Sequence, residues 1–245
     1  VGTWEELEPL RQGRFQVSST VIGDRWYVCG GCDLPHVRHS MECFNPATGR
    51  WTLQAPMREA RSLAASASTG SHLYVCGGFN GSGVLDGAEL FSAVTGTWEQ
   101  LTPMLQRRFG AAAVMQEQTI IVCGGACASA VLSSVEAYDT FAQTWTALPE
   151  MCAPRMEALA ASVAGRLYVC GGRTESCELD STECFDMRAF RWQQVQPMSQ
   201  PRSNHVAVVM QRPRRLPPSR SSSASASSSP SLGWAPPPLP AWPPC

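Results

Sequence analysis

Apolar and polar residues alternate along the chain in short segments that end at a pair of glycines. Residues 73–78 read LYVCGG, and related segments occupy residues 26–31 (WYVCGG), 120–125 (IIVCGG) and 167–172 (LYVCGG). An apolar, β-branched and aromatic run of this length predicts a buried strand, and the glycines predict a turn with positive φ. Because the four segments lie 47 residues apart, the sequence predicts a repeat protein. No helical period is visible, so the predicted fold is all-β.

Several other residue types recur with the same spacing. The recurring positions are the glycine pairs Gly30 and Gly31, Gly77 and Gly78, Gly124 and Gly125, Gly171 and Gly172, the tryptophans Trp51, Trp98, Trp145 and Trp192, the arginines Arg61, Arg108 and Arg155, and the glutamates Glu42, Glu89, Glu136 and Glu183. Residues present once per unit are more typical of architecture than of catalysis. We therefore expect the arginines and glutamates to form buried hydrogen-bonded pairs, because buried charges require partners. Each tryptophan is expected to pack between neighbouring sheets.

Each unit contains four predicted strands. The first strand follows the arginine and is rich in alanine, serine and valine, as at residues 63–68 and 111–115. The second strand ends at the glycine pair, the third carries the glutamate, and the fourth carries the tryptophan. Four strands in about 45–50 residues are typical of one blade of a β-propeller. A solenoid is the alternative, but small side chains on the first strand favour blades that converge on an axis.

The segment at residues 73–108 combines these motifs most fully. It reads LYVCGGFNGSGVLDGAELFSAVTGTWEQLTPMLQRR, with a glycine pair after an apolar strand, Glu-x-aromatic, a tryptophan and Pro-Met-x-x-x-Arg. The combination resembles the kelch repeat, and residues 4–210 look most like the propeller of BTB–kelch proteins. In that family a BTB domain engages a cullin-based ubiquitin ligase and the propeller selects the substrate, whereas some kelch proteins bind actin. The chain differs from the family because it contains no BTB segment and fewer than the usual six blades.

We expect an incomplete ring of four complete kelch-type blades. The predicted units are residues 14–60, 61–107, 108–154 and 155–201. Residues 1–13 are expected to contribute a lone outer strand at 3–7, and residues 202–211 a lone inner strand at 204–210. The edges of such an open arc would recruit another chain or aggregate. Residues 212–245 are rich in proline and serine and lack acidic residues, which predicts a disordered tail, with a polyproline ligand at 236–240 as the alternative.

Composition and charge narrow the possible functions. The formal net charge of −1 indicates no binding to nucleic acid or to an anionic membrane surface. All 19 basic residues are arginines, which excludes lysine-based covalent catalysis by this chain. No apolar run approaches the roughly 18–20 residues of a membrane span. Four of the 11 cysteines occupy one repeat position, which favours reduced, buried thiols and a cytoplasmic location.

One local pattern mimics a metal site. Cys29 and Cys32, with His36 and His39 nearby, have spacing typical of zinc ligands. However, Cys29 is the recurring strand cysteine, and no other unit contains the partners, so we expect neither a metal nor a cofactor. Paired carboxylates and tyrosine–histidine clusters are also missing from the pattern, which predicts a binding protein rather than an enzyme.

Specificity is expected where the units differ. The resemblance places the positions just after each glycine pair and just after each repeated arginine on one face, near the central channel. The residues predicted to contact a partner are Gln16, Asp33, Ser62, Phe79, Asn80, Phe109, Glu157, Arg173, Glu175, Ser203 and Asn204. Loop residues of mixed charge, with aromatic residues among them, suit a protein partner.

The sequence therefore predicts a protein-interaction module. The first hypothesis is the substrate-recognition propeller of a BTB–kelch adaptor, which would reach a cullin ligase only through a BTB domain outside this segment. The alternatives are an actin- or cytoskeleton-binding protein, and a truncated product without an independent function.

Overall fold

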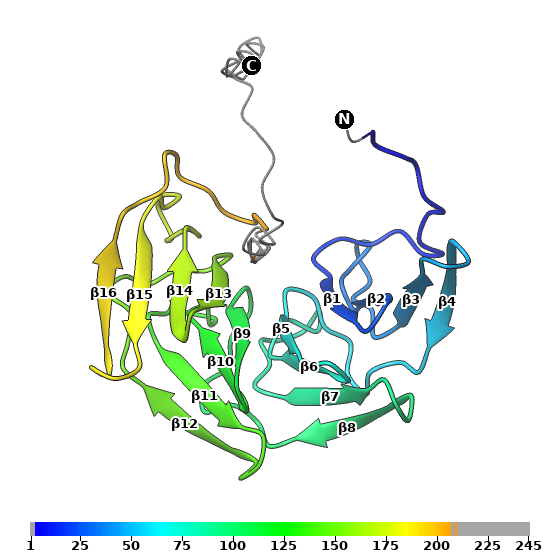
Figure 1. Cartoon of the computed structure of the whole chain (residues 1–245), viewed down its shortest axis with the longest axis horizontal. Coiled ribbons are helices and arrows are strands. Elements are labelled where there is room, and N and C mark those ends of the chain that lie inside the picture. The colour runs from blue at the N-terminus through cyan, green and yellow to red at the C-terminus, as the bar shows by residue number, and fades with distance from the viewer. Residues whose placement is uncertain (1–2, 207–208, 210–245) are drawn as a thin grey trace, which may run out of the picture. The chain divides into compact units, whose positions relative to one another are not determined.

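The computed structural model describes residues 3–206 and 209, which contain sixteen strands and no helix (Figure 1). The first two sheets consist of β1 (Ser18–Ile22), β2 (Arg25–Cys29), β3 (Met41–Asn45) and β4 (Arg50–Gln54), followed by β5 (Ala65–Ser68), β6 (His72–Cys76), β7 (Ala88–Ser92) and β8 (Thr97–Leu101). The next two consist of β9 (Ala112–Gln116), β10 (Thr119–Cys123), β11 (Val135–Asp139) and β12 (Thr144–Leu148), followed by β13 (Leu159–Val163), β14 (Arg166–Cys170), β15 (Thr182–Asp186) and β16 (Arg191–Val195). The predicted all-β fold of four four-stranded blades is confirmed.

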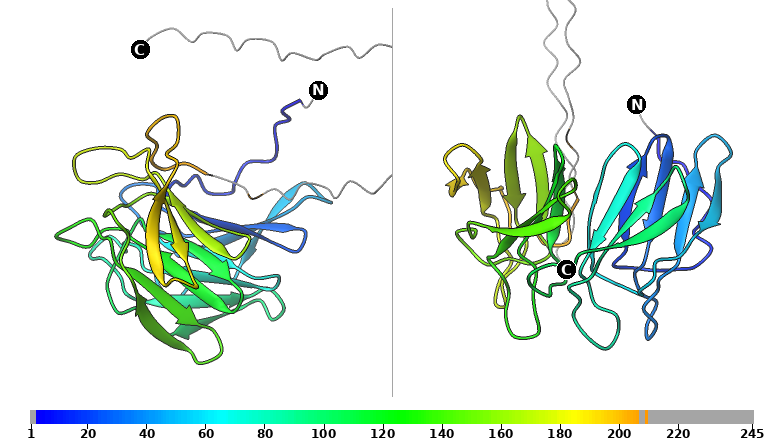
Figure 2. Two further views of the ribbon diagram at one scale, coloured as in Figure 1. Left: turned by 60° about the vertical axis from the view of Figure 1, so that its left-hand side comes forward. Right: turned by 90° about the horizontal axis from the view of Figure 1, so that it is seen from below.

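Each sheet is an antiparallel meander in which the strands follow their order in the sequence. The four sheets, which we call blades 1 to 4, lie one after another around an open arc, with their first strands on the inside (Figures 1 and 2). The inner strands β1, β5, β9 and β13 contact one another in sequence order. Their small residues, such as Ala65, Ala67 and Ala112, are buried at these contacts. Small side chains allow the inner strands to approach closely around the axis.

The hydrophobic core consists of layers between neighbouring blades. Between blades 2 and 3, for example, Tyr74 and Cys76 on one side pack against Ile120 and Val122 on the other. Strand alternation explains this arrangement, because successive residues point to opposite faces and both faces of an internal blade are covered. The near-continuous apolar second strand of each unit follows from burial on both sides.

The recurring tryptophans join adjacent blades. The indole N–H of Trp98 on β8 donates a hydrogen bond to the carbonyl of Ala55, 2.8 Å away, in the connection that follows β4. Trp145 makes the equivalent bond to Thr102, and Trp192 makes it to Pro149. Each indole is therefore packed and hydrogen-bonded at an interface between blades, which is the environment that the sequence predicts.

The two ends of the arc differ from the prediction. Residues 3–10 form no strand, and Trp4 is fully exposed, because none of the described strands lies beside residues 3–7 to pair with them. The segment nevertheless packs against blade 1, since the carbonyl of Glu8 accepts the indole N–H of Trp51 at 2.8 Å. Residues 204–206 form no strand either. The rest of the predicted inner strand, apart from residue 209, and the predicted tail at 212–245 lie outside the described residues.

Candidate functional site

A buried arginine and a buried glutamate form an ion pair in every blade. In blade 2 the Nη2 atom of Arg61 lies 2.8 Å from Oε1 of Glu89, and both side chains are almost completely buried. Equivalent pairs join Arg14 to Glu42, Arg108 to Glu136 and Arg155 to Glu183. The predicted pairs are therefore present, and each lies within one blade.

Additional hydrogen bonds partner most polar atoms of the buried pair; Nε of Arg61 has no partner among the described residues. Nη1 of Arg61 donates to the carbonyls of Gly77, at 2.7 Å, and of Gly87, at 2.9 Å. The Glu89 carboxylate accepts the backbone N–H groups of Arg58 and Glu59, which lie in the connection from blade 1. The pair thus ties the glycine turn, the third strand and the connection between blades to one point. A buried ion pair requires such additional partners to offset its desolvation.

The glycine pair makes the contact to the next blade. Gly77 and Gly78 have φ of 66° and 99°, and the N–H of Gly78 donates to the carbonyl of Arg108 in blade 3 at 2.8 Å. A Cβ atom on Gly77 would lie 2.3 Å from that carbonyl oxygen. Glycine is therefore required both by the backbone conformation and by the close approach of the next blade.

A second recurring position, two residues after each arginine, lines the mouth of the arc. We call its five members the mouth row, which consists of Gln16, Leu63, Gly110, Glu157 and Asn204. All five have φ between 50° and 62°, in the left-handed region. The N–H of each member after Gln16 donates to the carbonyl of the member before it, in four bonds of 2.7 to 3.1 Å. These backbone bonds link the blades without using any side chain.

The loops after the glycine pairs are fixed beside the mouth row. Ser62 and Phe79 exchange two backbone hydrogen bonds of 2.9 Å, and isolated bridges join Phe109 to Ala126 and Met156 to Arg173 in the same manner. The positions predicted after each glycine pair and after each arginine are therefore adjacent to each other in every blade. Backbone hydrogen bonds therefore fix the loops that carry the variable residues.

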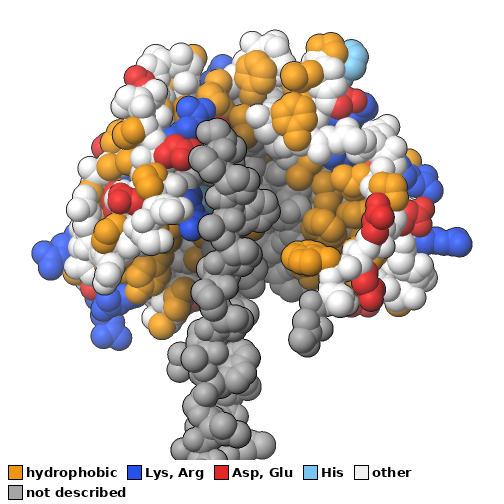
Figure 3. Space-filling model, turned by 90° about the horizontal axis from the view of Figure 1, so that it is seen from above, with side chains coloured by type: hydrophobic (Ala, Val, Ile, Leu, Met, Phe, Trp, Pro, Cys, Tyr) orange, Lys and Arg blue, Asp and Glu red, His pale blue; other side chains and the backbone are white. Residues whose placement is uncertain are grey.

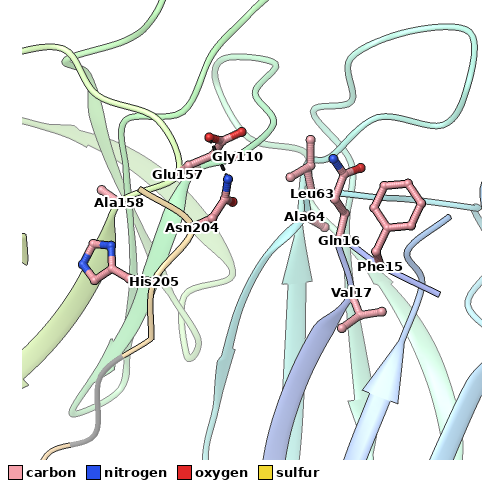
Figure 4. Close-up of a pocket in the computed structure, with 11 residues that line it drawn as sticks. Phe15, Gln16, Val17, Leu63, Ala64, Gly110, Glu157, Ala158, Asn204 and His205 are labelled. Atoms are coloured by element: carbon pink, nitrogen blue, oxygen red, sulfur yellow. Dashed lines mark hydrogen bonds between the residues drawn. The ribbon is translucent and has the colours of Figure 1, made fainter. Parts of the chain in front are cut away.

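The mouth row surrounds a cavity of about 530 Å³ (Figure 4). Phe15, Val17 and Leu63 line one side and supply an apolar surface, whereas Glu157 and Asn204 line the opposite side and supply polar groups (Figure 4). A cavity of this size, with an apolar wall and a few converging polar groups, suits a side chain or a short segment of a partner.

The polar side of the cavity is held in place by a partly buried hydrogen-bond network. The Glu157 carboxylate accepts Nε of Arg173 at 2.6 Å and Nδ2 of Asn204 at 3.0 Å. The hydrogen bonds to Glu157 raise the pKa of Arg173 above its ordinary value. The two charges compensate each other, so the network presents fixed hydrogen-bonding atoms rather than net charge.

The structure separates the predicted partner-binding residues into groups. Gln16, Glu157 and Asn204 line the cavity, and Arg173 supports it through Glu157. Phe79 and Glu175 are exposed outside the cavity, and Phe109 is partly buried.

Four other predicted partner-binding residues already have structural partners. Ser62 is buried and its hydroxyl contacts the carbonyl of Phe79, Asp33 pairs with Arg38, and Ser203 donates to Glu178. Asn80 accepts two backbone N–H groups of its own turn, from Ser82 and Gly83. These residues shape the loops beside the cavity.

Gly110 and His205 line the cavity but were not among the predicted partner-binding residues, whereas Phe15 and Leu63, which also line it, hold the predicted positions after a repeated arginine. The signal that could have found Gly110 is its place two 47-residue intervals after Gln16. Gly110 leaves a gap in the row, because its position carries no side chain. His205 stands where the equivalent positions carry the smaller residues Ala64, Ala111 and Ala158.

The zinc-like spacing near Cys29 has a structural explanation. Burial raises the pKa of Cys29 to about 12, so the thiol stays protonated, whereas zinc binding needs a thiolate. His39 contacts the Met57 carbonyl through Nδ1 at 3.2 Å. Within the described residues, no group of three or more His, Cys, Asp or Glu side chains is placed to hold a metal ion. The part of the chain that the structure describes contains no helix long and apolar enough to span a membrane.

Comparison with known families identifies the repeat. The profile of the KLHDC2/KLHL20/DRC7 kelch-repeats domain matches residues 16–214, which is most of the chain. The chain belongs to this kelch-repeat family. A solved structure of YjhT is similar in fold, with a TM-score of 0.74 and 17% identity over 82% of this chain and 76% of that chain. No curated protein matches the sequence. Membership of the kelch-repeat family indicates a protein-interaction module; kelch propellers are generally not enzymes.

Proposed function

We propose that this kelch-repeat chain recognises a protein partner through the cavity at the mouth of the arc. The observation that carries the proposal is the mouth row. Its backbone geometry is the same in every blade, but its side chains are an amide, an aliphatic group, no side chain, a carboxylate and another amide. Binding residues are expected where a rigid scaffold presents differing side chains.

The chemistry of the cavity favours a partner segment with two kinds of group. The Phe15 and Leu63 side would accept an apolar side chain, while Glu157 and Asn204 would accept and donate hydrogen bonds. Phe79, at 36% exposure, adds an aromatic surface beside the cavity. An aromatic or aliphatic anchor with a polar rim is a common form of protein interface.

The finer proposal is that the partner is a substrate for a cullin-based ubiquitin ligase, with this propeller as the recognition arm and a BTB domain elsewhere in a longer protein. It rests on the resemblance to BTB–kelch propellers. Actin binding is the second candidate and rests on the same resemblance. Neither candidate follows from the cavity alone.

The test compares two variants of the chain in proximity labelling. Leu63→Arg places a large charge at the apolar side of the cavity, whereas Phe141→Arg places the same charge on a turn residue that is 94% exposed and lies outside the cavity-lining set. We expect the labelled partners to be lost with Leu63→Arg and retained with Phe141→Arg. Equal labelling by both variants would contradict the proposal.

Two further measurements separate the finer candidates. A ligase substrate that depends on this chain should accumulate in cells when cullin ligases are inhibited, whereas an anchoring partner should not. Co-sedimentation with filamentous actin tests the second candidate directly, and absence of the chain from the pellet removes it.

A further inference from the structure

The face of blade 1 that points away from blade 2, which we call its outer face, carries a row of large apolar residues across all four strands. Cross-strand pairing aligns Val21 with Trp26, Trp26 with Phe44, and Phe44 with Trp51. The ring centroids of Trp26 and Trp51 are 5.4 Å apart. We call these four residues the blade 1 row.

In each of the other blades the residue at the position of Trp26 is buried. Leu73, Ile120 and Leu167 occupy the position of Trp26, and each has an exposed fraction of 0% because the preceding blade covers it. Trp26 has an exposed fraction of 41%, and Val21 has one of 63%. Figure 3 looks into the opening of the arc, where hydrophobic side chains gather on the side formed by blade 1. The largest residue at this position therefore stands where no blade of the described chain covers it.

At the other end of the arc, the outer face of blade 4 is the face that points away from blade 3, and no described blade covers it. Tyr168 and Cys170 lie on this face and are partly exposed, whereas Tyr27 and Tyr74, at the position of Tyr168, are buried by the following blade. A cavity of about 410 Å³ opens on the same face and is lined by Leu159, Cys170, Met198, Ser199, Arg202, His205 and Val206. Strand alternation places the second strand of a following blade over these positions.

The three interfaces inside the chain show how such faces combine. At each of them the row of one blade packs against the tyrosine- or isoleucine-bearing face of the blade before it, as Leu73 and Phe91 do against Tyr27 and Cys29. The ring centroids of Tyr27 and Phe91 are 5.8 Å apart in this interface. Phe44 and Trp51 of the blade 1 row are already buried, whereas Val21 and Trp26 are exposed. The exposed half of the blade 1 row and the partly exposed face of blade 4 are thus the two halves of a fourth interface of the same kind.

We propose that two copies of this chain associate head to tail, with the blade 1 row of each copy packed on the outer face of blade 4 of the other. A head-to-tail contact forms a closed ring when its rotation fits, and eight blades lie within the range of known propellers. Gln16 of one copy would then follow Asn204 of the other in the mouth row, and its N–H would donate to the Asn204 carbonyl. The partner copy therefore completes the mouth of the cavity.

Sedimentation velocity of the full chain over a hundredfold concentration range tests the proposal. We expect a species of twice the 26.5 kDa chain mass that dissociates on dilution. Trp26→Arg and Tyr168→Arg should each shift the chain to monomer, while Phe141→Arg, on an exposed turn, should leave the dimer intact. A single cooperative thermal transition in each variant confirms that it is folded, although the melting temperature should fall because the stabilisation by association is lost.

Mixing the two variants distinguishes a head-to-tail contact from a symmetric one. The Trp26→Arg copy retains its blade 4 face and the Tyr168→Arg copy retains its blade 1 row, so the mixture has one undamaged interface and should form a dimer again. A dimer that ignores either substitution, or variants that fail to associate on mixing, would overturn the proposal. A chain that is monomeric throughout, for example because its own residues 207–245 cover the face, would overturn it too, as would open-ended growth with concentration.

Discussion

Two positions of the repeat, only two residues apart, behave in opposite ways. The arginine position keeps its side chain in all four blades and buries it, as in Arg61, Arg108 and Arg155. The mouth row keeps only its backbone conformation, with positive φ and a hydrogen bond to the preceding blade, while its side chain changes from unit to unit. Both positions join blades through backbone carbonyls.

The difference shows how one repeat separates stability from recognition. At the arginine, the side chain itself supplies the hydrogen bonds that hold the glycine turn and the connection between blades. At the mouth row, the backbone alone makes the contact, so the side chain is free to differ. Substitutions at the two positions should therefore have very different effects on the free energy of unfolding.

The largest effect is expected at a buried arginine. Arg108→Met leaves the buried Glu136 carboxylate without its partner, and the free energy of unfolding should fall by about 3–5 kcal/mol. The neighbouring Arg107→Met is the matched control, because Arg107 pairs with Asp86 at the surface, and its loss should be below about 1 kcal/mol. Urea unfolding of both variants measures the difference, and similar losses would refute the structural role of the buried pair.

Alkaline pH should weaken the same scaffold. Burial raises the pKa of Cys29, Cys76 and Cys123 from 9.0 to about 12, so these thiols remain protonated in the fold but ionise in the unfolded chain. The contribution of these thiols to the free energy of unfolding is complete below the unfolded-chain pKa of 9.0. It is lost as the pH rises toward the folded-state pKa of about 12. Between pH 7 and 10 the three together should lose about 4 kcal/mol.

The cysteine contribution can be isolated by substitution. Cys123→Ala should reduce the pH-dependent loss of stability by about a third, since one of three buried thiols is removed. Cys177→Ala, at an exposed position, should leave it unchanged. An identical pH dependence in both variants and the original chain would assign the effect to other groups.

Glycine substitutions should give the next largest effect. Gly77→Ala combines positive φ with a Cβ only 2.3 Å from the Arg108 carbonyl oxygen, and Gly96→Ala has φ of 71° with no atom within 4 Å. We expect a loss of about 3 kcal/mol for Gly77→Ala and about 1 kcal/mol for Gly96→Ala. Thermal melting of the pair separates close approach from backbone strain. Equal losses would mean that the approach of the next blade is unimportant.

The smallest effect on stability is expected in the mouth row. Leu63→Gly relieves a φ of 52° that is unfavourable for leucine, while it removes some packing, so the net change should stay within about 1 kcal/mol. Partner labelling should nevertheless fall, because the apolar side of the cavity is lost. A loss of stability as large as that of Arg108→Met would show that the mouth row is part of the scaffold.

Much of the fold could be predicted because the residues that are buried in every blade recur at the same positions of the repeat. Residues that recur at 47-residue intervals identify the strands, the glycine turns and the Arg61–Glu89 type of pair. The site was predicted only in part. Gly110 went unnoticed because a missing side chain gives no chemical signal. Ser62 and Asp33, which were expected to face a partner, also contact Phe79 and Arg38 of the chain itself.

The sequence by itself determined the number of complete blades, the order of their strands and the residues that repeat. These features depend on local pattern and on burial that is the same in every unit. Only the tertiary structure decided which variable residues meet, because Gln16, Leu63 and Glu157 lie on different blades and come together through the curvature of the arc. It also decided that Trp26 is exposed while Leu73 is buried, since exposure depends on whether a neighbouring blade is present rather than on the residue or its strand.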